Sequence, residues 1–562
     1  MSTPRPTLAV RDLRVTFGSR RTAREVVHGV SFEVAPGEVL AIVGESGSGK
    51  SVTALALMGL LPRGSGAVTG GSANFEGIEL FGLDPEARRR IAGPRIGMIF
   101  QEPMTSLNPV LSIGTQMTEG PVAHGLATPA EARAQAIAML ERVGIPDGAA
   151  RLSQYPHEFS GGMRQRVMIA MAMMMKPALL IADEPTTALD VTIQAQILDL
   201  MRALIAETGT SLILITHDMG VVAETADRVL VMRHGRMVEE GAVGPLFAQP
   251  RKDYTRALLA AVPRLDGPTA SAVAGTASPI VRVDGVSKTF SGRSETRALD
   301  AVSLDIMAGE TVALVGESGS GKSTLGRAVA RLIDVDDGAI LVDGTDMARL
   351  RGGALRRARA KVQMVFQDPY ASLDPRFTVG RTVAEPMNIH RKAGRGEARE
   401  LAGALLQQVG LDAGLAGRYP HEFSGGQRQR VAIARALAAG PAIIVADEPT
   451  SALDVSIQAQ VLDLLTQLRD SRGIAFLFIS HDLAVVRRIS SRVAVMRAGR
   501  ILEIGPTAAV LDEPRHVYTR ALLSAAPVPD PEVRGRVRVS VPVGDYPAGP
   551  LVEAAPGHWV AS

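Results

Sequence analysis

The sequence contains no cysteine in 562 residues. This absence excludes disulfide bonds, thiol catalysis, and zinc or iron–sulfur sites that depend on thiolate ligands. Long apolar runs are missing as well: the most apolar one, residues 167–175, ends at Lys176-Pro177 and is too short to span a bilayer. The N-terminal stretch MSTPRPTLAVRDLRV lacks the apolar core of a signal peptide. If the protein works at a membrane, we expect it to do so through a partner.

Neither sign of charge dominates the sequence. It has 61 Lys and Arg against 58 Asp and Glu, a formal net charge of +3, and no long basic run. This balance does not favour a dedicated nucleic-acid-binding protein. The hydrophobic share of 46% and the charged share of 21% are ordinary for globular proteins. The length predicts two to four domains.

The chain repeats itself. The octapeptide GESGSGKS occurs at residues 44–51 and again at 316–323, and the motifs around Ser160, Asp183 and His217 recur 264 positions later. A period this long indicates a duplicated domain rather than a solenoid. We expect one domain over 1–262, a linker rich in Pro, Gly, Ala and Ser over 263–279, and a second domain over 280–530. A Pro- and Gly-rich tail follows over 531–562, and its packing is left open.

Both repeats predict an α/β fold. The continuous apolar runs VLAIVG, ALLIADEP and SLILITHD are typical of buried parallel strands. Residues 51–61 and 128–153 have the spacing of helices, and short alternating stretches near the start of each repeat predict further strands. Strands that alternate with helices in this way indicate a mostly parallel sheet covered by helices.

GESGSGKS fits the phosphate-binding pattern G-x-x-x-x-G-K-[ST]. Its glycines let backbone N–H groups approach phosphates, and the helix that follows adds its positive N-terminal end. Lys50 and Lys322 would reach the β- and γ-phosphates of a nucleotide, and Ser51 and Ser323 would ligand Mg²⁺. We assign nucleotide binding to all sixteen residues: Gly44, Glu45, Ser46, Gly47, Ser48, Gly49, Lys50, Ser51, Gly316, Glu317, Ser318, Gly319, Ser320, Gly321, Lys322 and Ser323.

An acidic pair ends one apolar strand of each repeat: Asp183-Glu184 and Asp447-Glu448. Alone, such a pair is often only a solvated strand end. After a phosphate-binding loop, the Asp is expected to hold Mg²⁺ and the Glu to polarise an attacking water.

A Ser-Gly-Gly segment precedes a helix in each repeat, at Ser160, Gly161 and Gly162 and at Ser424, Gly425 and Gly426. It predicts either a second anion-binding helix start or an ordinary serine N-cap. Taken alone, the cap is the better interpretation.

Together these motifs resemble those of the ATP-binding subunits of ABC transporters, in the fused two-copy form of the dipeptide/oligopeptide importer group. The glutamine loops IFQEPMTSLNP and VFQDPYASLDP, FSGG-x-RQR, ADEPT, TALD and SALD, ITHD and ISHD, and the two -YTRALL endings carry the resemblance over nearly the whole chain. It implies two tandem P-loop NTPase domains, each with a RecA-like core, an antiparallel β part and a helical signature subdomain. In that family the two domains stack head to tail, so Lys50 would work opposite Ser424 and Lys322 opposite Ser160.

The resemblance also implies individual roles. Gln101 and Gln367 would contact Mg²⁺ and report to the membrane subunit, and His217 and His481 would contact the γ-phosphate as catalytic residues beside Glu184 and Glu448. Asp190 and Asp454 would cross the domain interface.

The resemblance also implies contacts with the adenine base and the sugar of the nucleotide. Phe17 and Phe290 occupy the place where the family stacks an aromatic ring on adenine, although a core Phe is the alternative. Gln427 would lie near the nucleotide sugar, and Met163 departs from it at the equivalent place.

The resemblance implies an ATPase that drives two membrane permease subunits, with an extracytoplasmic solute-binding protein, from the cytoplasmic face of the inner membrane. No direct contact with the cargo is expected. Dipeptides and oligopeptides are the expected cargo, with glutathione, nickel chelates and antibiotic peptides open. The alternative is a soluble twin-domain ATPase acting on ribosomes or nucleic acid, but the linker is short and has only Arg264 and Asp266 as charged residues.

Overall fold

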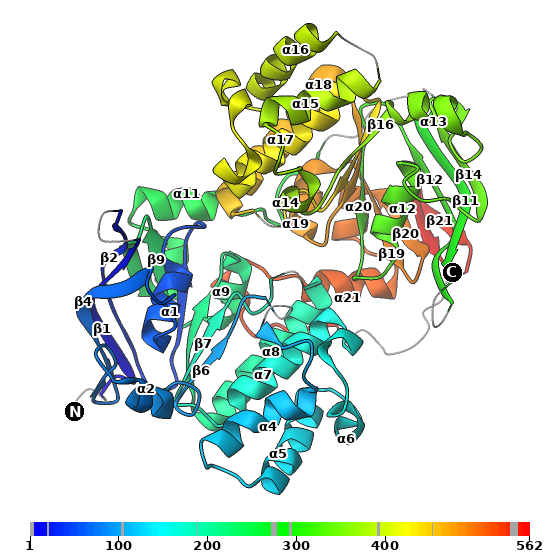
Figure 1. The fold of residues 1–562 in the computed structure, drawn as a ribbon. Helices are drawn as coiled ribbons and strands as arrows, with labels where there is room; N and C mark the ends of the chain where they lie inside the picture. The colour runs from blue at the N-terminus through cyan, green and yellow to red at the C-terminus, as the bar shows by residue number, and fades with distance from the viewer. Residues whose placement is uncertain are drawn as a thin grey trace. The chain divides into compact units, whose positions relative to one another are not determined.

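The computed structural model describes residues 5–18, 22–102, 106–187, 189–270, 278–291, 295–390, 394–451, 453–539 and 549–562. By its contacts the chain divides into two compact units (Figure 1). The first comprises Met1–Leu189, Ile193–Val262 and Pro527–Arg536. The second comprises Asp190–Thr192, Pro263–Ala526 and Val537–Ser562.

The first repeat contains two sheets. An antiparallel sheet has the order β2-β1-β4-β5, and a second sheet has the order β10-β9-β3-β8-β7-β6, in which every neighbouring pair except β9 and β10 is parallel. The strands are β1 (Leu8–Phe17), β2 (Arg24–Val34), β3 (Val39–Val43), β4 (Gly66–Phe75), β5 (Ile78–Glu79), β6 (Ile96–Ile99), β7 (Leu179–Asp183), β8 (Ser211–Ile215), β9 (Arg228–Arg233) and β10 (Arg236–Ala242).

Helices cover the second sheet and form a separate group inserted between β6 and β7, where α4, α5 and α7 pack on one another. The helices are α1 (Lys50–Met58), α2 (Pro85–Ile91), α4 (Ile113–Ala123), α5 (Pro129–Arg142), α6 (Gly148–Arg151), α7 (Gly161–Met173), α8 (Val191–Thr208), α9 (Met219–Thr225), α10 (Val243–Ala248) and α11 (Asp253–Ala261).

The apolar strands of the mainly parallel sheet are buried on both faces. In β3, Leu40 and Ile42 belong to a core shared with the antiparallel sheet and α1, whereas Ala41 and Val43 belong to a core shared with α7 and α8. Because successive side chains point to opposite faces, both faces need apolar residues, and the run is continuous rather than alternating. Each fully buried aliphatic side chain contributes about 1.5–3 kcal/mol.

The second repeat has the same plan. Its antiparallel sheet has the order β12-β11-β14-β15, and its larger sheet has the order β16-β17-β18-β13-β19-β20-β22-β21. The strands are β11 (Val281–Phe290), β12 (Thr296–Ile306), β13 (Thr311–Val315), β14 (Asp337–Val342), β15 (Thr345–Asp346), β16 (Val362–Val365), β17 (Ile443–Asp447), β18 (Ala475–Ile479), β19 (Arg492–Arg497), β20 (Arg500–Pro506), β21 (Leu551–Ala555) and β22 (His558–Ala561). The helices are α12 (Lys322–Val329), α13 (Gly352–Arg359), α14 (Pro369–Ser372), α15 (Val379–Ile389), α16 (Arg395–Gln408), α17 (Gly425–Ala438), α18 (Val455–Arg472), α19 (Leu483–Ile489), α20 (Thr507–Asp512) and α21 (Val517–Ala525). The predicted fold class, with its antiparallel part and inserted helices, is confirmed.

Two ordered pieces lie in or overlap the tail 531–562, whose packing the sequence left open. Strands β21 and β22 form a hairpin that adds to the larger sheet of the second unit, with Val560 and Trp559 opposite Glu503 and Ile504 of β20. The turn between the two strands holds Pro556-Gly557, a common turn dipeptide.

The other piece, Pro527–Arg536, belongs to the first unit although it follows the second repeat. Glu224 of α9 is 2% exposed and accepts hydrogen bonds from Val528 N and Arg536 Nη2, each at 3.3 Å. Arg534 donates to two carbonyl oxygens at the end of α9, at 3.2 Å each. These contacts give a buried carboxylate the partners that it needs.

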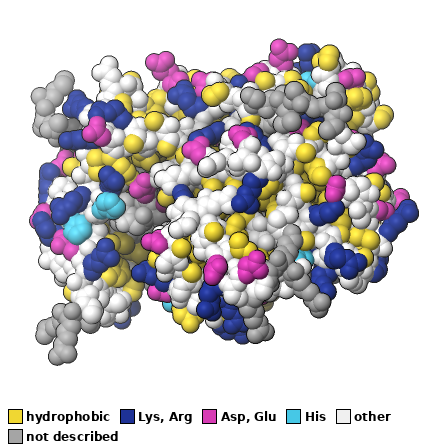
Figure 2. Space-filling view, turned by 90° about the horizontal axis from the view of Figure 1, so that it is seen from above, with side chains coloured by type: hydrophobic (Ala, Val, Ile, Leu, Met, Phe, Trp, Pro, Cys, Tyr) yellow, Lys and Arg dark blue, Asp and Glu magenta, His cyan; other side chains and the backbone are white. Residues whose placement is uncertain are grey.

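The surface is mixed in charge. On the face shown in Figure 2, Lys and Arg side chains and Asp and Glu side chains are scattered among uncharged ones, in keeping with the net charge of +3. Within the described ranges, no helix is both long and apolar enough to cross a membrane.

Candidate nucleotide-binding sites

The two phosphate loops connect a strand to a helix, β3 to α1 and β13 to α12, and their first glycines have no substitute. Gly44 has φ 149°, and a Cβ atom there would lie 2.1 Å from the carbonyl oxygen of Met232. Gly316 has φ 146° and the same 2.1 Å approach to the carbonyl oxygen of Met496. The loops therefore run against the end of a neighbouring strand in a conformation that other residues rarely adopt.

Each loop lysine folds back over its own loop. Lys50 Nζ donates to the carbonyl oxygens of Gly44 at 2.7 Å and Glu45 at 3.0 Å. Lys322 Nζ does the same with Gly316 at 2.8 Å and with the following residue at 2.7 Å. Burial lowers the pKa of Lys322. Each ammonium group is thus centred in a loop where the charge of a bound phosphate would attract it.

The serine and aspartate expected to hold Mg²⁺ meet in both repeats. Ser51 Oγ donates to Asp183 Oδ1 at 3.1 Å, and Ser323 Oγ donates to Asp447 Oδ1 at 2.8 Å. Burial raises the pKa of Asp183 to about 6 and also raises the pKa of Asp447. A cation placed between these oxygens would favour the charged carboxylate.

This donor set fits Mg²⁺. The described residues contain no cluster of three or more His, Cys, Asp or Glu side chains that could hold a metal ion. Mg²⁺ does not require one, because it is usually bound by one or two protein oxygens together with substrate phosphates and waters. The hydroxyl and carboxylate oxygens named above would be the protein's share, with the ion neutralising phosphate charge.

The glutamate after each aspartate is held by a glutamine and a histidine. Gln101 Nε2 donates to Glu184 Oε2 at 2.8 Å, and His217 Nδ1 lies 3.2 Å from Glu184 Oε1. Burial would raise the pKa of Glu184, but the hydrogen bond and charge of His217 outweigh it and hold that pKa at about 2. Thr187 Oγ1 donates to the same carboxylate at 2.9 Å. Glu184 is therefore an ionised base.

The second repeat reproduces this group. Gln367 Nε2 donates to Glu448 Oε2 at 2.7 Å, and His481 Nδ1 lies 3.4 Å from the same carboxylate oxygen. Burial opposes the charge on both partners, yet their interaction lowers the pKa of Glu448 and raises that of His481. The two glutamates also share a left-handed backbone, with φ 48° at Glu184 and 47° at Glu448. Such strain costs on the order of 1–3 kcal/mol and is common at functional sites.

The Ser-Gly-Gly segments begin α7 and α17. Ser160 Oγ accepts from Met163 N at 3.3 Å, and Ser424 Oγ accepts from Gln427 N at 3.4 Å. Both serines are therefore the N-cap residues of their helices, and the anion-binding role of these segments stays a prediction. A Cβ atom on Gly162 would lie 2.8 Å from Ile193, so this glycine is also required for close packing against α8. Gly426 has the same role against α18.

The two segments differ at one position. The side-chain carbonyl of Gln427 accepts from Ser424 N at 3.0 Å and completes a reciprocal capping box. Met163 cannot accept such a bond. The carbonyl oxygen of Gln427 is thus bonded to the backbone of its own helix, and its place near the nucleotide sugar stays a prediction.

The motifs thus converge at one edge of each sheet. The phosphate loop, the Asp-Glu pair, the glutamine and the histidine follow the carboxyl ends of β3, β7, β6 and β8, and their counterparts follow β13, β17, β16 and β18. In open α/β sheets this edge is where ligands bind.

Comparison with known families agrees with this geometry. The model of the ABC transporter family matches residues 27–187 and 299–451, and the model of the oligopeptide/dipeptide transporter C-terminal region matches 238–297 and 502–546. The glutathione import ATP-binding protein GsiA of Pectobacterium atrosepticum is 49% identical over 98% of this chain and 96% of its own length. That of Escherichia coli (strain K12) is 48% identical over 99% of this chain and 96% of its own.

The chain belongs to the ABC transporter family. It is an ATP-binding subunit whose ATP hydrolysis is coupled to transport. A solved dimeric ATP-binding cassette bound to ADP and Pi is 33% identical over 40% of this chain and 98% of its own, with a TM-score of 0.38.

The two phenylalanines expected at adenine in this ABC subunit lie in different surroundings. Phe17 is partly buried against the core of its antiparallel sheet, near Gly66. Phe290 is 44% exposed, and Lys288 Nζ lies 5.6 Å from its ring centroid. The core alternative therefore describes Phe17 better than Phe290.

For the two aspartates expected at the domain interface, the structure shows a local hydrogen bond at one and a helix start at the other. Asp190 Oδ1 accepts from Thr192 Oγ1 at 2.7 Å, and Asp454 is the N-cap residue of α18. Their role between domains stays a prediction.

One pair of residues that contacts the phosphate loops was not singled out from the sequence. In the sequence, the -YTRALL endings indicate only the repeat and the family. In the structure, Tyr254 and Tyr518 contact the loops through their hydroxyl groups. The repetition of the motif was the available signal. The contact itself depends on how α11 and α21 dock, which periodicity does not give.

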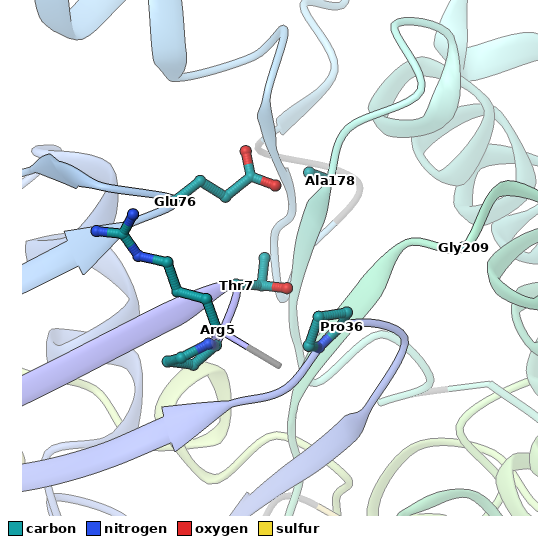
Figure 3. A pocket seen from close by; sticks show the side chains of 7 residues that line it. Arg5, Thr7, Pro36, Glu76, Ala178 and Gly209 are labelled. Atoms are coloured by element: carbon teal, nitrogen blue, oxygen red, sulfur yellow. The ribbon is translucent and has the colours of Figure 1, made fainter. Parts of the chain in front are cut away.

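A cavity of about 290 Å³ lies elsewhere in the first unit (Figure 3). Arg5, Glu76 and Pro36 are among its lining residues, with Ala178 and Gly209 just before β7 and β8. It is therefore at the amino ends of the parallel strands, opposite the edge that carries the ABC motifs. It is not the nucleotide site.

Proposed function

We propose that this ABC subunit drives an importer of short peptides, glutathione among them, from the cytoplasmic face of the inner membrane. Its partners are two membrane permease subunits and an extracytoplasmic solute-binding protein. The observation that carries this proposal is the similarity to the glutathione import proteins over nearly the whole of both chains, together with the match to the oligopeptide/dipeptide C-terminal region in both repeats.

The two sites have the same chemical equipment for hydrolysis. Lys50 and Lys322 would hold the phosphates, and the Ser51–Asp183 and Ser323–Asp447 pairs would hold Mg²⁺. The ionised Glu184 and Glu448 would orient the attacking water, and His217 and His481 keep these carboxylates charged. This arrangement supports two hydrolytic sites rather than one.

Each site is proposed to be completed by the other repeat, with Lys50 opposite Ser424 and Lys322 opposite Ser160. The absence of cysteine makes a direct test available. Ser46→Cys would be combined with Gly425→Cys or, as the matched control, with Gly161→Cys. A Cβ atom at Gly161 meets nothing within 4 Å, and at Gly425 the nearest atom is 3.9 Å away, so both positions accommodate cysteine.

With ATP, the Ser46/Gly425 pair should be joined by a short bismaleimide and the Ser46/Gly161 pair should not. Cross-linking of the same-repeat pair alone would contradict the head-to-tail arrangement.

Transport is tested by reconstituting the subunit in proteoliposomes with the permeases and solute-binding protein encoded beside it. We expect ATP-dependent uptake of radiolabelled glutathione or a dipeptide. A solute-binding protein that binds neither would contradict the cargo, while ATPase activity stimulated by another loaded receptor would leave the importer in place. Ribosome sedimentation without permease association would instead favour the soluble alternative.

A further inference from the structure

The helices that carry the repeated -YTRALL sequence each place one hydroxyl on a phosphate loop. Glu45 N donates to Tyr254 Oη at 3.4 Å, across 209 positions of sequence. Glu317 N donates to Tyr518 Oη at 3.1 Å, across 201 positions. The same contact in both repeats indicates a shared role rather than a chance approach of a surface side chain.

The hydrogen bond to the tyrosine hydroxyl involves a peptide group that the loop lysine also contacts. The peptide that joins Gly44 to Glu45 has its carbonyl bound by Lys50 Nζ at 2.7 Å and its N–H bound by Tyr254. In the second repeat, Lys322 and Tyr518 hold the equivalent peptide in the same way. A lysine that turns toward a bound phosphate releases this carbonyl. The tyrosine is then the side chain that keeps the first turn of the loop in place.

Each ring is itself fixed. The guanidinium carbon of Arg233, the last residue of β9, lies 4.7 Å from the ring centroid of Tyr254. Arg497, at the same place in β19, lies 5.2 Å from that of Tyr518. Cation–π contacts of this kind are attractive and restrict the movement of the ring. Burial raises the pKa of Tyr518, so its hydroxyl is protonated at neutral pH.

We propose that Tyr254 and Tyr518 are positioning residues that hold the phosphate loops in their binding shape, and that the C-terminal hairpin reinforces this at the second site. The proposal rests on the assignment of the two loops as ATP sites. Both hydroxyls bond to the backbone of the loop, which is why the role is one of positioning.

The reinforcement follows from how α21 is anchored. His516 caps this helix, its Nδ1 accepting from Tyr518 N at 3.1 Å. The fully buried Glu503 accepts from His516 N at 3.1 Å and from Arg515 N at 2.8 Å. His558, in the C-terminal hairpin, lies 2.8 Å from Glu503 Oε1. A chain of hydrogen bonds thus connects the hairpin to the second phosphate loop.

Among the residues that the structure describes, the first repeat shows no counterpart to the outer part of this chain, His516 Nδ1 and His558. Glu239 accepts from the backbone N–H groups of Arg251 and Lys252 at 2.8 and 3.1 Å, as Glu503 does in its own repeat. In the first repeat, however, these contacts are exposed, and the N-cap residue Lys252 makes no side-chain cap. Tyr254 is partly exposed, whereas Tyr518 is fully buried. We therefore expect the second loop to depend more strongly on its tyrosine.

The test removes one tyrosine hydroxyl and measures ATP binding at a single site. In a Lys50→Ala background, which leaves the Lys322 site, Tyr518→Phe is expected to weaken Mg²⁺-ATP binding by about three- to tenfold in equilibrium dialysis, the effect of one lost hydrogen bond. Tyr254→Phe in a Lys322→Ala background should weaken binding by less. Tyr419→Phe and Tyr155→Phe are matched controls, since both remove the hydroxyl of an exposed tyrosine.

Thermal unfolding and hydrogen exchange separate positioning from a general loss of structure. The melting temperature should stay close to that of the background protein, while the amides of residues 317–321 exchange faster in Tyr518→Phe. Binding within twofold of the background would overturn the proposal, and so would a lowered melting temperature with no faster exchange in the loop. A background protein that binds no ATP would count against the site assignment instead.

The hairpin is tested by a double-mutant cycle. His558→Phe should weaken binding at the second site, and the loss should shrink when Tyr518→Phe is already present, because both act on one chain of contacts. Fully additive effects would overturn the part assigned to the hairpin.

Discussion

The two repeats agree at their catalytic centres and differ in what surrounds them. The Ser–Asp, Gln–Glu and His–Glu distances differ between repeats by 0.1–0.3 Å. In contrast, only the second sheet is extended by β21 and β22 among the described residues, and only the second Ser-Gly-Gly helix has a capping box. The chemistry requires one geometry at a sheet edge, whereas the support of that geometry is free to diverge.

The largest expected effect tests whether the two centres are equivalent. Glu184→Gln and Glu448→Gln should each slow ATP hydrolysis by about a hundredfold or more, because each removes an ionised base. Phosphate release and retention of ATP in a closed state would be measured. Glu86→Gln is the control, since Glu86 is an exposed glutamate paired with Arg90 on α2.

If one variant lost most of its ATP hydrolysis while the other kept the wild-type rate, the two sites would not be equivalent. It would show that only one of the two centres hydrolyses ATP.

The next effect concerns pH and the metal. The raised pKa of Asp183, about 6, means that its carboxyl is protonated below that pH and must lose a proton before it binds Mg²⁺. In a Lys322→Ala background, Mg²⁺-dependent ATP binding should therefore weaken as pH falls from 7 to 5, by up to about tenfold per unit below the pKa. Calorimetry in two buffers of different ionisation enthalpy would detect the proton release.

The pH dependence of folding stability has the opposite sign to that of Mg²⁺-dependent ATP binding. A carboxyl whose pKa is raised from 3.8 to about 6 on folding favours the folded state at low pH, and this contribution is lost as pH rises through 6. Removal of Mg²⁺ should consequently destabilise the protein more at pH 7 than at pH 5. Asp183→Asn should abolish both trends, and a pH-independent affinity between 5 and 7 would contradict the assignment.

Much of this comparison could be predicted from sequence because the relevant signals are local. Continuous apolar runs indicate strands buried on both faces, and polar motifs directly after them must lie at the carboxyl edge of the sheet. Lys50, Asp183 and His217 are brought together by that rule alone, and the structure confirms that their motifs share this edge. The duplication supplied a second copy of every such argument.

The structural features around the two centres could not be predicted, because they depend on contacts between segments far apart in the sequence. Whether β22 pairs with β20 is decided by the edge that β20 leaves available, and the short stretch around Trp559 carries little alternation of its own. The contact between Tyr518 and Glu317 depends on the position of α21. The bond from Ser424 N to the side-chain carbonyl of Gln427 was not predicted either, because the family resemblance places this residue near the nucleotide without showing what its carbonyl oxygen bonds to.

The smallest expected effect tests that last difference. Met163→Gln should give α7 the capping box that α17 has, stabilising the first unit by about 0.5 kcal/mol and raising its melting temperature by about 1–2 °C. Gln427→Met should lower that of the second unit by a similar amount, because Ser424 N loses its partner. Calorimetric unfolding would measure both shifts. If the position acts through the helix alone, ATP affinity should change by less than twofold in either variant. A fivefold change in ATP affinity with no change in stability would instead show that this side chain contacts the nucleotide. The difference between Met163 and Gln427 would then be a difference between the two ATP sites, not only between the two helix caps.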